Sequence, residues 1–64
     1  MAIVKTENLE HNRRHETWKI TFSDDIASYS KSELLDYCAS ISFLWDTCIT
    51  PLNDNTVLYT GYTD

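Results

Sequence analysis

The 64-residue chain has little of what marks several familiar classes of small protein. It contains one glycine, one proline and two cysteines. Two cysteines are too few for the disulfide framework of a small secreted scaffold, and a reducing compartment keeps them as thiols. We therefore interpret Cys38 and Cys48 as small core hydrophobes, with a structural disulfide between them as the alternative.

Long apolar runs are also absent. No run approaches the roughly 20 residues that cross a bilayer. The N-terminus lacks the basic region and apolar stretch of a secretion signal. We expect a cytoplasmic protein that makes no membrane contact.

Positive charge is scarce and unevenly placed. Ten acidic residues face five lysines and arginines, which gives a net charge of −5. Residues 1–19 hold four of the cations against three acids, a net of +1, whereas residues 20–64 hold one against seven, a net of −6. A body with this balance repels phosphate backbones, so we expect no direct nucleic-acid binding.

The remaining composition is that of one folded domain over residues 1–64, with 42% hydrophobic and 12% aromatic residues. A chain this short buries only about 60% of the surface that it exposes when unfolded. Its core is therefore thin, and such a chain gains stability from a partner or from a second copy of itself.

The clearest local pattern is an alternation over residues 17–23, where Trp18, Ile20 and Phe22 are apolar and their neighbours are polar. This period of two predicts a half-buried strand, with Trp18 at the centre of the core. Residues 2–8 include the β-branched Ile3, Val4 and Thr6 and are predicted to pair with it antiparallel. The connection, residues 9–16, then carries the basic cluster around Arg13 and Arg14 at its tip.

A helix is predicted to begin at Ser30, three residues before Glu33, in the spacing of a capping box. Apolar residues follow at intervals of three and four and predict one stripe that faces the sheet: Leu34, Leu35, Cys38, Ile41 and Trp45. Phe43 falls on the far side of this helix. It marks either an interface or a helix that has already ended.

A second hairpin follows, with strands predicted over residues 47–50 and 56–60. Asn53, Asp54 and Asn55 lie between them, and these residue types tolerate the left-handed backbone of tight turns. Pro51 donates no ladder bond, so its strand ends there or lies at an edge. The predicted fold is α+β, in the order ββαββ, with one helix packed on an antiparallel sheet.

Neither a metal site nor a catalytic site is predicted. His11, His15 and the two cysteines are potential zinc ligands, but nine residues separate the cysteines, unlike those of metal fingers. A nucleophile, a histidine and a carboxylate are available, yet so small a domain has little room for a pocket of about 300 Å³. We expect no enzyme and no cofactor.

The positive signal is the combination of acids and aromatics. Part of the acidic charge is explained by helix capping and solvated surface. The rest can imitate a nucleic-acid backbone, and exposed aromatics anchor interfaces. The predicted protein-binding residues are Asp24, Asp25, Asp36, Phe43, Trp45, Asp46, Asp54, Tyr59 and Tyr62. Arg13 and Arg14 are also suited to contact with a partner protein.

These features predict a non-enzymatic module that inhibits or modulates a larger protein, one with a basic nucleic-acid groove. In size and charge the chain resembles the broad class of phage counter-defence inhibitors, which includes anti-CRISPR and anti-restriction proteins. That resemblance involves no motif and assigns no site residue. The alternative is a structural protein that forms a homodimer through its sheet edge and the Phe43 side.

Overall fold

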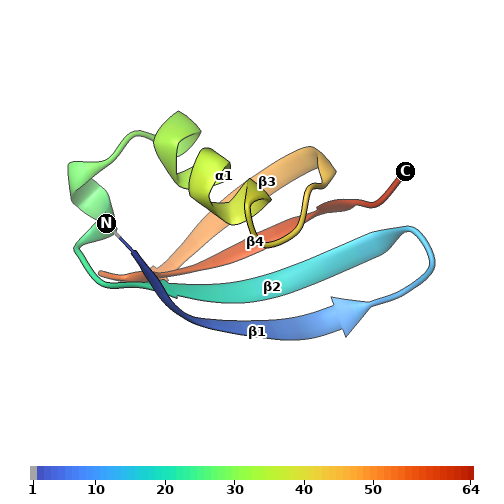
Figure 1. Ribbon diagram of the computed structural model, residues 1–64, viewed down its shortest axis with the longest axis horizontal. Coiled ribbons are helices and arrows are strands. Elements are labelled where there is room, and N and C mark those ends of the chain that lie inside the picture. Colours follow the sequence, from blue (N-terminus) through green and yellow to red (C-terminus); the bar gives the residue numbers. More distant parts are fainter. Residues whose placement is uncertain (1) are drawn as a thin grey trace.

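A computed structural model describes residues 2–64. The elements in chain order are β1 (Ile3–His11), β2 (His15–Phe22), the 3-10 helix η1 (Ile26–Ser28), α1 (Lys31–Ala39), β3 (Trp45–Asn53) and β4 (Thr56–Tyr62). The four strands form one antiparallel sheet in the order β1-β2-β4-β3, and α1 lies on one of its faces (Figure 1). The predicted α+β fold with the order ββαββ is confirmed.

The first hairpin is longer and its turn tighter than predicted. β1 continues to His11 and β2 begins at His15, so the two strands include most of the expected connection. The side-chain oxygen of Asn12 accepts the backbone N–H groups of Arg14 at 3.2 Å and His15 at 2.9 Å. This side-chain turn places Arg13 and Arg14 at the tip, as predicted.

The second hairpin runs through the proline. β3 includes Pro51 and is an edge strand, so the missing N–H can face away from β4. The edge alternative is thus confirmed. A positive φ was expected at residues 53–55 and is not found there; among the non-glycine residues described, it occurs at Asp46, with φ of 50°.

The helix begins as predicted. Glu33 N–H donates to Ser30 Oγ at 3.1 Å, and Ser30 N–H donates to Glu33 Oε1 at 3.2 Å, which completes the capping box. Of the helical residues, Leu34 and Cys38 are buried against the sheet. The apolar stripe is therefore correct over its first turns.

The predicted end of the helix is wrong. α1 ends at Ala39, so Ile41 and Trp45 do not lie on it. Ser40 Oγ donates to the carbonyl of Tyr37 at 2.6 Å, a local bond that competes with further helical backbone pairing. For Phe43, the alternative that the helix has already ended is the correct one.

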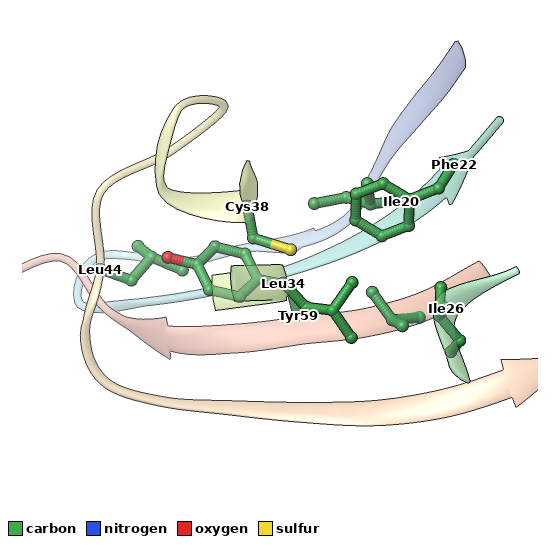
Figure 2. Close-up of a cluster of buried hydrophobic side chains, with 8 residues drawn as sticks. Ile20, Phe22, Ile26, Leu34, Cys38, Leu44 and Tyr59 are labelled. Atoms are coloured by element: carbon green, nitrogen blue, oxygen red, sulfur yellow. The ribbon is translucent and has the colours of Figure 1, made fainter. Parts of the chain in front are cut away.

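The core lies between α1 and the face of β2 and β4 that it covers (Figure 2). Its fully buried side chains are Ile20, Phe22, Cys38, Val57 and Tyr59. Trp18 is half-buried and packs against this cluster, so its prediction as the centre of the core is wrong. Its indole N–H requires a hydrogen-bond acceptor, which it finds in Glu16 at the margin of the core.

The two cysteines lie on opposite faces of the sheet. Cys38 is buried on α1, and burial raises the pKa of its thiol to about 11. Cys48 is exposed and pairs with Thr60, on the face that α1 leaves open. The prediction of Cys48 as a core residue is wrong, and both thiols are free.

The helices of this fold are short. Within residues 2–64, no helix is long and apolar enough to span a membrane, and α1 has only nine residues.

Candidate protein-binding surface

Exposed aromatic side chains gather at the end of the sheet where β3 begins and β4 ends. Phe43, Trp45 and Tyr62 are 66%, 57% and 47% exposed. The rings of Phe43 and Trp45 meet edge to face, with centroids 5.2 Å apart, and Trp45 is paired with Tyr62 across the two strands. We call these three residues the aromatic end. Exposed rings of this kind are typical of protein interfaces.

A buried carboxylate lies beneath the aromatic end. Glu16 accepts three hydrogen bonds: from Ser42 Oγ at 2.7 Å, from His11 Nδ1 at 2.8 Å and from Trp18 Nε1 at 2.9 Å. The bonds from Trp18 and Ser42 are the main causes that lower the pKa of Glu16, against the opposing effect of burial. Glu16 is therefore charged at neutral pH, and it holds His11 of β1 and Ser42 of the segment before β3, as well as Trp18 of its own strand.

Glu16 fixes the segment that carries Phe43. Ser42 donates to its carboxylate, and the carbonyl of Ser42 accepts the hydroxyl of Tyr59 at 2.9 Å. On the other side of Phe43, Leu44 is buried in the core. The residues before and after Phe43 are both anchored inward, so its ring is turned outward.

The single glycine of the chain permits this arrangement. A Cβ on Gly61 would lie 2.8 Å from both Leu44 Cβ and the carbonyl oxygen of Trp45. Any larger residue would therefore push the aromatic segment away from β4. The left-handed Asp46 and a register shift between Trp45 and Cys48 bend β3 at the same point, and such irregularities re-aim side chains.

A second histidine–carboxylate pair lies on the open face of the sheet. His15 Nδ1 contacts Glu10 Oε1 at 2.6 Å, and His15 Nε2 lies 2.9 Å from Thr60 Oγ1. The arrangement has the atoms of a hydroxyl–imidazole–carboxylate array. However, Thr60 Oγ1 donates to the carbonyl of Glu16 at 3.1 Å, so its proton is already engaged. The array fixes the orientation of the His15 ring. This ring contacts Tyr62 edge-on, with the two ring centroids 5.1 Å apart.

The basic hairpin tip adjoins the aromatic end. Thr63 N–H donates to the carbonyl of Arg14 at 3.0 Å, which ties the C-terminal residues to the tip. Figure 1 shows the C-terminus beside this turn. The arginines predicted to contact a partner therefore lie on the same side of the molecule as Tyr62.

Acidic residues mark the opposite end of the sheet. Asp24 and Asp25 follow β2, and Asp54 forms the turn between β3 and β4. The Asp54 carbonyl accepts the N–H of Ile26 at 2.8 Å, which joins the two segments. We call this end of the sheet, which these three acids mark, the turn end. β4 separates them from the aromatic end by about 20 Å, from its length at about 3.3 Å per residue.

An open cleft of ≈ 460 Å³ lies at the turn end. Its apolar side chains come from η1, α1 and β3, and Asp25, Lys31 and Asp54 supply charge around them. The volume exceeds the limit of about 300 Å³ expected from chain length, so that expectation is wrong.

The predicted binding residues are thus divided rather than gathered on one surface. Asp46 lies beside Trp45 at the aromatic end, and Asp36 is exposed on α1. Tyr59 is only 1% exposed, with its ring in the core and its hydroxyl on Ser42, so its prediction as a surface residue is wrong.

The residues that organise the aromatic end were not predicted from the sequence. Glu16 and Ser42 meet only in the fold and have no local signal. Gly61 has one, because an isolated glycine in a strand indicates a close backbone approach.

Potential metal ligands are dispersed as well. Within residues 2–64, no group of three or more His, Cys, Asp and Glu side chains is placed to hold a metal ion. Each histidine instead has a carboxylate partner.

Comparison of the chain with protein-family models, curated proteins and solved structures found no match.

Proposed function

We propose that the protein is a non-enzymatic binding module that docks on a larger protein through the aromatic end and so inhibits or modulates it. One observation carries this proposal. Phe43 and Trp45 are exposed although Glu16, Tyr59 and Gly61 fix the backbone that presents them. A rigid aromatic anchor loses little conformational entropy on binding, and aromatic anchors dominate the energy of many interfaces.

The proposed partner is a protein with a basic nucleic-acid groove. The net charge of −5 and the three acids of the turn end support this choice, because opposite charges accelerate the encounter of two proteins. The molecule is 33 Å long, so the turn end and the aromatic end can contact separate parts of one partner. Action in the cytoplasm as a phage-type counter-defence inhibitor is the corresponding biological role, supported by size and charge.

The proposal is tested by photocrosslinking from a defined position. A benzophenone amino acid replaces Phe43 in one version of the protein and Leu52 in a control. Leu52 is 47% exposed and lies near the turn end of β3. We expect position 43 to capture a nucleic-acid-handling protein from lysate, and position 52 to capture it weakly. The yield should fall as salt rises from low to about 0.15 M.

Three outcomes would contradict the proposal. They are equal capture from both positions, capture of a protein that handles no nucleic acid, and a yield that does not change with salt. Trp45→Ala in the protein labelled at position 43 adds an internal check, because it should abolish capture while leaving the chain folded.

A second candidate function is assembly. The observation that favours it is the long, exposed edge strand β1, whose outer side pairs with no strand among residues 2–64. An edge of this kind is a template for a further strand. In this role the protein is a structural subunit that forms a homodimer, and its mass in solution should depend on concentration.

A further inference from the structure

The two edges of the sheet differ in their ability to accept another strand. β3 contains Pro51, and it is bent at Asp46 by a register shift. Both features interrupt the pairing of a new strand. β1 contains neither proline nor glycine, and its two register shifts, between Ile3 and Lys5 and between Asn8 and Glu10, leave a regular segment from Lys5 to Asn8. β1 is therefore the edge open to pairing.

The regular part of β1 is complementary to itself. In an antiparallel pair related by a two-fold axis, opposed residues share a face, so the pairing is centred on one residue. Centring on Thr6 places Lys5 opposite Glu7 of the second copy, and Glu7 opposite the second copy's Lys5. Centring on Lys5 or on Glu7 would instead oppose two like charges, which is unfavourable.

The charges lie on a single face of the sheet. Lys5 is paired with Thr21 and Glu7 with Lys19, residues of β2 that point away from α1. In the pairing centred on Thr6, each Glu7 lies between Lys19 of its own chain and Lys5 of the second copy. The ladder of alternating charge therefore continues across the interface.

We propose that two copies of this chain associate through β1, antiparallel and centred on Thr6, so that two four-stranded sheets become one continuous sheet. This proposal gives the assembly function a defined interface. β3 lies on the far edge from β1, so the Phe43–Trp45 pair stays exposed in the dimer. A dimer would present two aromatic ends, which raises avidity for a partner with repeated sites.

The test exchanges the two charges. We compare the wild type with Lys5→Glu and Glu7→Lys by sedimentation across a concentration series, and confirm folding by circular dichroism. Each single variant opposes like charges at both cross-strand pairs, so its dimer should dissociate about tenfold or more readily. An equimolar mixture of the two variants restores opposite charges at both pairs and should form a heterodimer as stable as the wild-type dimer.

Lys31→Glu is the matched control, because it makes the same change of charge on α1, away from β1. It should leave the dimer intact. Thr6→Pro, which removes a backbone donor from the centre of the pairing, should weaken the dimer in every background. A wild type that stays monomeric at high micromolar concentration would overturn the proposal, as would a mixture that does not associate or an equal effect of Lys31→Glu.

This test is independent of docking through the aromatic end. Photocrosslinking from position 43 needs only an exposed Phe43 side, which a monomer also has. Loss of the dimer with crosslinking preserved would reject the β1 interface alone.

Discussion

The two ends of the sheet are held by interactions of different range. At the turn end, local side-chain bonds shape the turns: Asp25 accepts the N–H of Ala27, and Asn53 accepts the N–H of Asn55, each across two residues. The bond from Ile26 N–H to the Asp54 carbonyl then joins these turns across the fold. The capping box at Ser30 spans three.

At the aromatic end, by contrast, Ser42 lies 26 residues from Glu16 and 17 residues from Tyr59 along the chain. Local bonds form in short segments, whereas distant ones exist only when the whole domain is folded. The individual turns and the helix cap at the turn end can therefore be predicted from sequence, whereas the arrangement of the aromatic end depends on the complete fold.

The largest loss of stability is expected in the core, and a much smaller one is expected at the aromatic end. Tyr59→Ala removes a fully buried ring and the hydroxyl that holds Ser42, and it should cost about 3–5 kcal/mol. That is close to the whole stability of so small a domain. Trp45→Ala should cost about 1 kcal/mol or less, because its ring is largely exposed. Urea denaturation measures both, and an unfolded Trp45→Ala protein would place this ring in the core.

An intermediate loss of stability is expected at Glu16, whose charge holds the segment that carries Phe43. Glu16→Gln weakens three charge-assisted hydrogen bonds and should cost about 1–3 kcal/mol. Glu10→Gln is the matched control, since Glu10 is an exposed carboxylate that also pairs with a histidine. Equal losses in the two variants would show that Glu16 has no special role.

The charge of Glu16 should also make the stability of the protein depend on pH in acid. Hydrogen bonds from Trp18 and Ser42 hold the folded pKa of Glu16 below its usual value of 4.5. The unfolded chain then binds the proton more readily, so this stabilisation is present above pH 4.5 and is lost as the pH falls through the folded pKa. Thermal melts between neutral pH and pH 3 should show a shallower acid limb for Glu16→Gln than for the wild type. Parallel limbs would contradict this assignment.

A smaller loss of stability than at Tyr59 or Glu16 is expected at the helix cap of the turn end. Ser30→Ala removes the capping hydroxyl of α1 and should cost about 0.5–2 kcal/mol. Because this bond is distant from Phe43, capture by a crosslinker at position 43 should be unchanged at temperatures where the variant is folded. Reduced capture would mean that the two ends are coupled and that their comparison fails.

Much of the fold follows from local pattern. The alternation in β2 and the capping box of α1 depend only on residues close together in the sequence. The edge position of Pro51 follows from its missing N–H. The predicted end of the helix is wrong for a reason outside its own segment. Helical spacing continues past Ala39 in the sequence, but Ser42 is bound by Glu16, and the chain leaves the helix toward it.

The site was predicted only in part for the same reason. Phe43 and Trp45 stood out as surplus aromatics, yet nothing local distinguishes the exposed Tyr62 from the buried Tyr59. Both lie in β4, and their opposite environments depend on which face α1 covers. The acids were predicted to join the aromatics, but the length of β4 separates the two groups.

The dissociation rate of the captured partner tests the central claim most directly. We compare Trp45→Ala with Leu52→Ala, two exposed apolar residues of β3 at opposite ends of that strand. If the aromatic end carries the affinity, Trp45→Ala should weaken binding by about 30-fold, mostly through faster dissociation, as expected for a hot spot worth about 2 kcal/mol. Leu52→Ala should change it by about twofold at most. Equal loss in both variants, or a larger loss for Leu52→Ala, would contradict the account.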